Sequence, residues 1–135
     1  MTDRELLLAA VEARRDGYTP YSHFRVGAAL LTADGKIYTG ANIENAAYSP
    51  GVCAERVAIF KAVNAGERTF KKIAVVGGPE DGPIAPLCAP CGVCRQVMAE
   101  FCKDDFEILL GTPDNIKKYT LSTILPDYFG PKDLC

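Results

Sequence analysis

The spacing of hydrophobic positions along the chain predicts both helices and strands. Leucine, alanine and valine recur at helical spacing near the start, which predicts a helix from Thr2 to about Gly17. Thr2 and Glu5 have the spacing of a capping box, so the helix is expected to begin there. Further helices are predicted at 53–63, 91–101 and 121–125.

Continuous apolar runs between these helices predict strands. The first two, at 26–32 and 36–39, flank Asp34-Gly35, a strong hairpin signal. Two later runs, at 73–76 and 106–110, have the continuous hydrophobicity of strands buried on both faces. The order helix, hairpin, helix, strand, helix, strand predicts an α/β domain. Helices would cover both faces of a mixed sheet whose later strands are parallel.

Composition limits the classes of protein that fit this pattern. The 135 residues suit a single domain (1–135), and 48% hydrophobic residues suffice for a core. The net charge of −2 and three scattered basic pairs argue against a nucleic acid polymer as partner. No stretch approaches the roughly 20 apolar residues of a membrane helix, and the first residues do not resemble a signal peptide. We therefore expect no membrane partner and a cytoplasmic protein.

The cysteines are the strongest chemical signal. In a reducing compartment, six cysteines are metal ligands or free thiols rather than a disulfide framework. Cys53 opens one predicted helix with Glu55 two residues later, and Cys91 and Cys94 open another. Helix N-termini favour thiolates, and residues three apart share one helix face. Three protein ligands with an open fourth position is the pattern of a catalytic zinc site, so Zn²⁺ is the expected cofactor.

Other interpretations of these cysteines remain open at this point. Cys53 could be a small core residue, and Cys91 with Cys94 a redox pair, although a redox pair gives no reason for Glu55 to lie beside Cys53. Cys88 also has Cys-x-x-Cys spacing to Cys91, but it precedes the predicted helix, so we expect it not to be a ligand. Two more cysteines lie outside the motif spacing, at 102 and 135.

The chain resembles the cytidine deaminases, in particular the small homotetrameric form with three cysteine ligands. The resemblance runs nearly end to end. It is carried by residues 21–29 (YSHFRVGAA), 40–45 (GANIEN), 53–56 (CAER), 90–96 (PCGVCRQ) and 129–131 (FGP). Zinc deaminases use either one His and two Cys or three Cys as ligands. The only histidine, His23, lies far upstream of Cys53 and is expected to be an ordinary loop residue.

The resemblance implies a three-layer α-β-α fold with a mixed five-stranded sheet. It also implies hydrolytic deamination of free cytidine or deoxycytidine in pyrimidine salvage, by a homotetramer whose active sites are completed by neighbouring subunits. Cys53, Cys91 and Cys94 would hold the zinc, Glu55 would carry protons, and Arg56 would donate hydrogen bonds to the thiolates. The other implied site residues are Asn42 and Glu44 at the ribose, Phe24 and Phe129 at the base, Tyr48 at the subunit interface, and Ala54 with Cys91 at the pyrimidine edge.

Two alternatives to this function differ in what they require. A related three-cysteine aminopyrimidine deaminase of the blasticidin type would share the zinc site and differ in the contacts to the sugar. A zinc-stabilised binding module without activity would have a closed site of four ligands, with Cys88 as the fourth, and no need for Glu55. A polynucleotide deaminase would need a basic channel along the strand, which this charge pattern does not provide.

Overall fold

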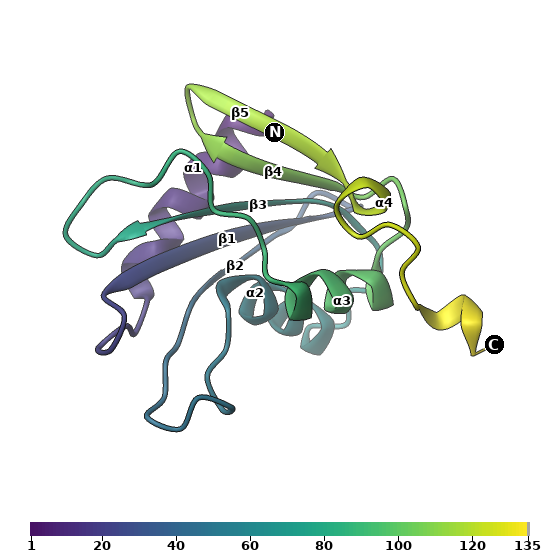
Figure 1. Cartoon of the computed structure of the whole chain (residues 1–135). Coiled ribbons are helices and arrows are strands. Elements are labelled where there is room, and N and C mark those ends of the chain that lie inside the picture. The colour runs from purple at the N-terminus through teal and green to yellow at the C-terminus, as the bar shows by residue number, and fades with distance from the viewer. Residues whose placement is uncertain (135) are drawn as a thin grey trace.

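The computed structural model describes residues 1–134, and Cys135 lies outside them. The chain forms one five-stranded sheet with helices on both sides (Figure 1). The strands are β1 (Phe24–Thr32), β2 (Ile37–Ala41), β3 (Phe70–Pro79), β4 (Glu107–Thr112) and β5 (Asn115–Thr120). The helices are α1 (Asp3–Ala13), α2 (Ala54–Asn64), α3 (Gly92–Phe101) and α4 (Leu121–Ile124), with 3₁₀ turns η1 (Arg14–Asp16) and η2 (Pro131–Asp133).

The sheet is mixed, with the strand order β2-β1-β3-β4-β5. β1 runs antiparallel to both β2 and β3, β3 and β4 are parallel, and β5 returns antiparallel to β4. The prediction that the later strands are parallel is therefore confirmed for β3 and β4. Their connection contains α3, as expected because parallel neighbours need a long crossover.

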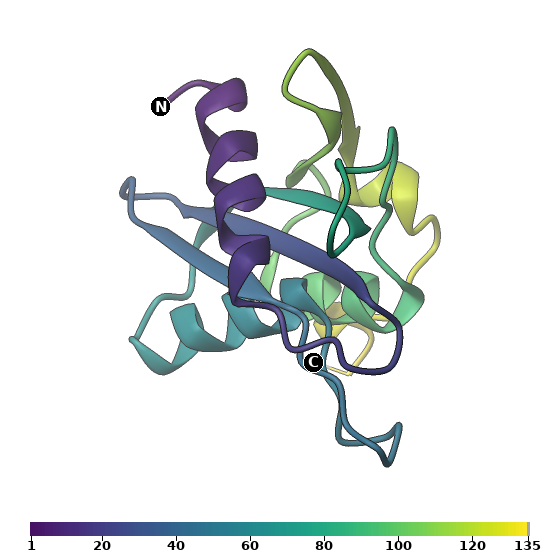
Figure 2. The same cartoon turned by 90° about the vertical axis from the view of Figure 1, so that its left-hand side faces the viewer.

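Alternate side chains of the central strands supply two separate cores. On β1, Ala28 and Leu30 face α2 and α3, whereas Ala29 and Leu31 face α1. The same alternation continues on β3 and β4, because successive strand residues point to opposite faces. Figures 1 and 2 show α1 on one side of the sheet and α2 with α3 on the other. This arrangement is the expected three-layer α-β-α fold.

Two details differ from the sequence prediction. The pattern alone did not predict β5, whose Lys117 and Lys118 are exposed because it is an edge strand that packs against β4 on one side only. Exposed lysines are a common feature of edge strands, where they hinder pairing with other chains. After α1 ends at Ala13, η1 continues to Asp16, so the helical segment stops at Gly17 as expected. Gly17 itself has an extended backbone rather than the left-handed conformation of a helix-ending glycine. The capping box is confirmed, with Thr2 and Glu5 each accepting a backbone hydrogen bond from the other.

A long loop between β2 and α2 projects from the body of the molecule, as Figures 1 and 2 both show. Ile43 at its base forms backbone bridges with Tyr18 and Val52, so the two ends of the loop are held together. Among the helices of the described residues, none is long and apolar enough to cross a membrane.

Candidate metal centre and surrounding pocket

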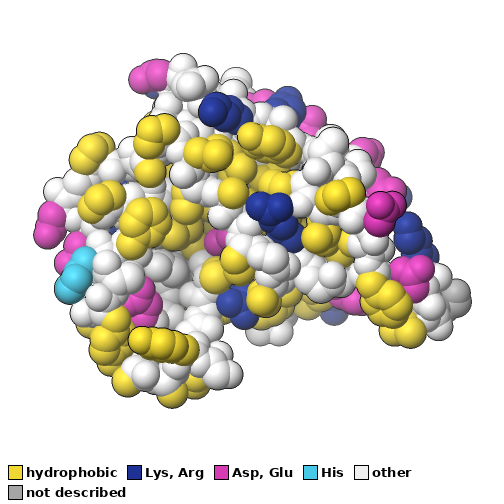
Figure 3. Space-filling view, viewed as in Figure 1, with side chains coloured by type: hydrophobic (Ala, Val, Ile, Leu, Met, Phe, Trp, Pro, Cys, Tyr) yellow, Lys and Arg dark blue, Asp and Glu magenta, His cyan; other side chains and the backbone are white. Residues whose placement is uncertain are grey.

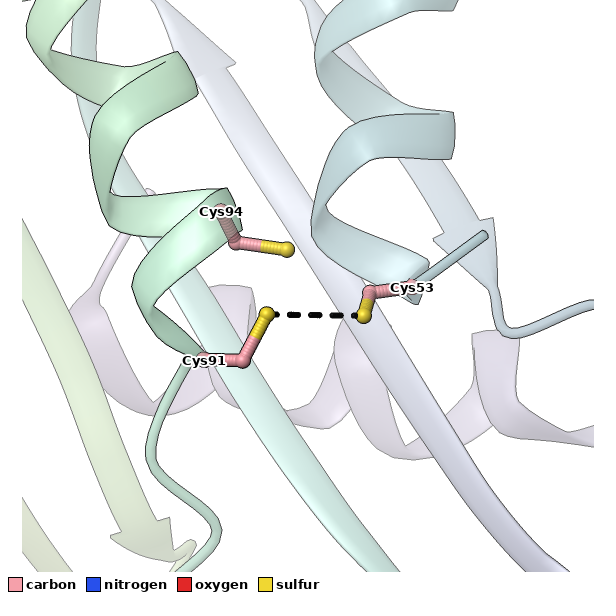
Figure 4. A group of neighbouring side chains, drawn as sticks. All are labelled: Cys53, Cys91 and Cys94. Carbon is pink, nitrogen blue, oxygen red and sulfur yellow. Dashed lines mark hydrogen bonds between the residues drawn. The ribbon is translucent and has the colours of Figure 1, made fainter. Parts of the chain in front are cut away.

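Three cysteine side chains converge where α2 and α3 begin. Cys53 is the N-cap of α2, Cys91 is the N-cap of α3, and Cys94 lies in the first turn of α3. Their Sγ atoms all lie within 4.8 Å of one another, and the Sγ atoms of Cys53 and Cys91 are 3.7 Å apart. Figure 4 shows the three sulfurs pointing into the space between the two helix ends. The cysteines thus lie at two helix N-termini, where free backbone N–H groups favour negative charge.

The environment of Cys53 favours the thiolate. The pKa of its thiol falls to about 5, because Cys94 and Arg56 donate hydrogen bonds to its sulfur, with Cys91 also in contact. The Nη2 atom of Arg56 lies 3.5 Å from Cys53 Sγ. The pKa of Cys94 is raised because its thiol donates to Cys53 and is buried. These contacts favour the thiolate at Cys53 over the thiolate at Cys94.

The donor set fits zinc. Two thiolates on a tetrahedral zinc, each bonded at 2.3 Å, lie about 3.8 Å apart, close to the separation of Cys53 and Cys91. In residues 1–134, the group of side chains close enough to share a metal consists of these three cysteines, without Cys88 or His23. A closed site of four protein ligands, which the binding-module alternative requires, is therefore not assembled by the described residues.

Glu55 lies next to the cysteines but is not one of their group. It sits in the first turn of α2, where a glutamate is usually exposed, yet its side chain is only 3% exposed. Burial raises the pKa of its carboxyl to about 7, and the nearby Cys53 charge acts in the same direction. Its Oε1 has no hydrogen-bond partner within the described residues. A buried carboxyl with a free oxygen and a pKa near neutrality is suited to proton transfer.

A pocket of about 340 Å³ opens beside these groups. Its size suits a small molecule. Two larger cavities, of about 550 and 570 Å³, lie at the other end of α3, away from Cys53, Cys91 and Cys94. The pocket brings together Cys53, Glu55, Arg56 and Cys91 with Asn42 and Tyr48, all of which the sequence analysis singled out.

Cys88 also lines this pocket, a position that its spacing did not reveal. Its thiol is half-buried, and burial raises its pKa to about 11, so it stays neutral. It lies against Gly77 on β3, where an added Cβ would be 2.6 Å from Cys88 Sγ and 2.9 Å from the Phe24 ring. Only glycine at position 77 leaves room for both side chains.

The two residues expected at the ribose lie on one side of an extended segment. Asn42 and Glu44 flank Ile43, so their side chains point to the same face. The Asn42 amide accepts from Val26 N–H at 2.9 Å and donates to the Phe24 carbonyl at 3.0 Å. Glu44 accepts from the backbone of Tyr21 and Ser22 and lines a neighbouring cavity of about 350 Å³, which shares Tyr48 with the pocket beside the cysteines.

Phe24 and Phe129 are not among the residues that line the pocket, whereas Tyr48 lines it from the projecting loop. Phe24 is 37% exposed at the start of β1, and Phe129 is 59% exposed in the tail. Tyr48, at the tip of the projecting loop, is 91% exposed. Figure 3 shows hydrophobic side chains on this loop and around the hollow above it. Ala54 is fully buried, and its N–H belongs to the first turn of α2, where no carbonyl of the helix accepts it.

The sequence analysis assigned no role to two residues of α3 that bind the segment before Cys91 and the tail. Arg95 donates to the Pro90 carbonyl at 2.8 Å and to the Ile124 carbonyl at 2.7 Å, which fixes the chain just before Cys91. Gln96 donates to the Phe129 carbonyl at 2.7 Å and so anchors the tail. Both residues follow Cys94 directly. The sequence could have indicated that such side chains donate hydrogen bonds to backbone carbonyls. It could not have indicated which segments supply those carbonyls.

Known proteins match this chain over nearly its whole length. The family model for the cytidine and deoxycytidylate deaminase zinc-binding region matches residues 1–110. A cytidine deaminase from Sporosarcina psychrophila is 48% identical over 135 residues, which are 99% of this chain and 96% of the relative. The crystal structure of cytidine deaminase from Burkholderia pseudomallei superposes with a TM-score of 0.86 at 47% identity, covering 96% of this chain and 100% of the other.

A blasticidin-S deaminase from Bacillus cereus is also similar, at 32% identity over 92% of this chain and 89% of that protein. This lower identity favours the cytidine deaminases over the blasticidin type, and relatives that are enzymes count against an inactive binding module. The fold, the three-cysteine group and the relatives agree. The chain belongs to the family of cytidine and deoxycytidylate deaminases with a zinc-binding region.

Proposed function

We propose that this protein hydrolyses free cytidine, deoxycytidine or both to the uracil nucleoside and ammonia. The observation that carries the proposal is the unpartnered, buried oxygen of Glu55, in a pocket whose wall also contains Cys53 and Cys91. The cytidine deaminases similar to this chain support cytosine nucleosides as the substrate class.

Cys53, Cys91 and Cys94 are proposed to hold the zinc. A zinc ion held there would supply a nucleophile near neutral pH, because zinc lowers the pKa of bound water to about 7. Three thiolates oppose this effect, since together they carry more negative charge than the ion carries positive charge. The hydrogen bond from Arg56 to Cys53 and the two helix N-termini offset part of that charge.

Glu55 carries the protons of the reaction. Its carboxylate takes a proton from the attacking water and delivers it to ring N3 of the cytosine. It then takes the remaining proton from the new hydroxyl on C4 and gives it to the amine, which leaves C4 as ammonia. Water and the cytosine nucleoside thus become the uracil nucleoside and ammonia, with atoms and charge balanced. A carboxyl whose pKa is about 7 can both accept and release a proton at neutral pH.

The substrate contacts proposed here distinguish a free nucleoside from a nucleic acid. Asn42 and Glu44 would bind the sugar, mainly its 3′-hydroxyl. The pKa of Glu44 is held below its usual range by the hydrogen bonds from Ser22, so its side chain is a carboxylate at neutral pH. A carboxylate at the 3′-hydroxyl would repel a 3′-phosphate. Phe24 would stack on the base, and the backbones of Ala54 and Cys91 would meet the pyrimidine edge.

The strong exposure of Tyr48 and Phe129 supports a second part of the proposal, a homotetramer. Phe129 does not line the pocket of its own chain. It would close the pocket of a neighbouring subunit, and Tyr48 would lie at the interface between subunits. We further propose a cytoplasmic location, where the thiols of the zinc site stay reduced.

The test of the function is a spectroscopic assay. Purified, zinc-loaded protein is mixed with cytidine, and conversion to uridine is followed by ultraviolet absorbance. Glu55→Gln is expected to abolish turnover while zinc stays bound, whereas Glu100→Gln, at an exposed position on α3, is expected to behave as wild type. Turnover retained by Glu55→Gln would refute the role of Glu55. No turnover by zinc-loaded wild type would refute cytidine as the substrate.

A further inference from the structure

A single hydroxyl connects two of the residues proposed to contact substrate. Ser22 Oγ donates a hydrogen bond to Glu44 Oε2. The same oxygen accepts a hydrogen bond from the backbone N–H of Phe24 at 3.1 Å. Ser22 therefore links the carboxylate expected at the sugar with the backbone of the ring expected at the base.

Most of the hydrogen-bonding capacity of Glu44 is used by the loop that precedes β1, through Tyr21 and Ser22. Its Oε1 accepts from the N–H groups of Tyr21 and Ser22, each at 3.1 Å, and its Oε2 accepts from the Ser22 hydroxyl. A carboxylate has about four lone-pair positions. Within the described residues, Glu44 thus keeps one position for a further donor, on the oxygen that Ser22 orients.

The backbone between Ser22 and Phe24 needs such support. His23 has a φ of 55°, a left-handed conformation that residues other than glycine adopt only where their surroundings hold it. On the side away from Glu44, the loop is held by Glu80, whose N–H donates to the His23 carbonyl at 2.8 Å and whose carboxylate accepts from Thr19 Oγ1 at 2.9 Å. Ser22 provides the corresponding contact on the side of Glu44.

We propose that Ser22 is a positioning residue for nucleoside binding: its hydroxyl, which the Phe24 N–H holds in place, aims the last free lone pair of Glu44 at one sugar hydroxyl. This inference rests on the proposed function, because it assumes that Glu44 meets the sugar. Ser22 itself carries no proton in the reaction. Its loss should weaken binding and leave the chemical step intact.

The experiment compares Ser22→Ala, Glu44→Ala and the double variant on cytidine and on 3′-deoxycytidine, which lacks one sugar hydroxyl. Ser22→Ala is expected to raise the KM for cytidine about 10-fold, with kcat changed less than 3-fold and zinc content unchanged. Its KM for 3′-deoxycytidine should rise far less. The double variant should be no worse on cytidine than Glu44→Ala, because Ser22 acts on the sugar through Glu44.

Two further variants separate positioning from general loop stability. Ser22→Thr, which keeps a hydroxyl, should recover most of the affinity for cytidine. Thr19→Val removes one hydrogen bond from the same loop, on the side of Glu80, and should leave both KM values near those of wild type. Two outcomes would overturn the proposal. One is an equal rise of KM in Thr19→Val and Ser22→Ala. The other is a KM for cytidine in the double variant that is raised by the product of the two single effects.

A measurement without substrate keeps the inference separate from the proposed function. Hydrogen exchange at the Phe24 amide should be at least 5-fold faster in Ser22→Ala than in wild type, since this amide loses its acceptor. Unchanged exchange would overturn the positioning role even if cytidine is turned over. Inactivity of zinc-loaded wild type toward cytidine would instead refute the proposed function, and with it the sugar-binding role of Glu44.

Discussion

Arg56 and Cys53 lie within one turn at the start of α2, with the guanidinium Nη2 3.5 Å from the cysteine sulfur. The contact stabilises both charged forms, since the pKa of Arg56 is raised by Cys53 and the pKa of Cys53 is lowered by Cys94 and Arg56. The arginine therefore belongs to the charge balance of the sulfur cluster.

Replacing this arginine is expected to impair the site without unfolding the protein. Arg56→Gln should lower zinc affinity or kcat by about 10- to 100-fold, the usual effect of losing a hydrogen-bond donor to a metal ligand. Zinc titration against a competing chelator and steady-state kinetics would measure both. Arg68→Gln, at an exposed position two residues before β3, is the matched control. Equal behaviour of the two variants would contradict the proposed contact.

Serine substitutions should distinguish Cys88 from the three clustered cysteines by their effect on bound zinc. Cys53→Ser, Cys91→Ser and Cys94→Ser should each lose bound zinc and activity, because the remaining two sulfurs cannot form the site. Cys88→Ser should keep one zinc per chain, although it lines the same pocket. Metal content after purification and desalting tests this directly. Zinc lost from Cys88→Ser would show that the cluster has a fourth member.

The position of α2 depends on the absence of a side chain on β2. A Cβ at Gly40 would lie 2.5 Å from the Ala54 carbonyl oxygen and 2.7 Å from the Ala58 nitrogen, both of them backbone atoms that cannot move aside cheaply. Gly40→Ala is expected to destabilise the fold by about 1–3 kcal/mol, as overpacking does. At Gly82 the nearest atom would be 3.5 Å away, so Gly82→Ala should be tolerated. Urea denaturation of both variants would test the difference.

Four charged side chains join α1 to the strands β3, β4 and β5. Asp3 Oδ1 lies 2.7 Å from Lys72 Nζ, and Asp3 Oδ2 lies 3.0 Å from Lys118 Nζ. Glu107 contacts both lysines as well. The pKa of Asp3 is lowered mainly by its hydrogen bond from Lys72.

The lowered pKa determines how the Asp3 contribution varies with pH. A carboxyl whose pKa is lower in the folded state contributes stability above its unfolded pKa and loses it as pH falls through the folded value. Asp3→Asn should therefore lower the free energy of unfolding by about 1 kcal/mol at pH 7. The difference from wild type should shrink below the ordinary value of 3.8. Denaturation at pH 7 and pH 3 would measure this, and a constant difference would contradict the ion pair.

Much of the fold could be predicted from local patterns. The helix starts at Cys53 and Cys91, the hairpin at Asp34-Gly35 and the buried runs within β3 and β4 were all visible as periodicity and turn chemistry. β5 was not visible, because its run I-K-K-Y is half-exposed and lacks both the alternation of a one-sided strand and the continuous hydrophobicity of a buried one. The family resemblance, rather than the pattern, indicated a fifth strand.

The sequence by itself determined which chemistry is possible here. Cys91 and Cys94 share one face of a helix because they are three residues apart, and Glu55 must lie beside Cys53 because both begin α2. These relations are local, so the backbone of a single helix enforces them. The five matching segments then indicated the family.

Tertiary structure decided what those local relations could not. Cys53 meets Cys91 across 38 residues because α2 and α3 pack on the same face of the sheet. Glu55 has a raised pKa because neighbouring elements bury a position that a lone helix would expose. Ser22 reaches Glu44 across 22 residues because the segment at Ile43 pairs with Tyr18. Each depends on packing between segments far apart in the chain, which periodicity does not encode.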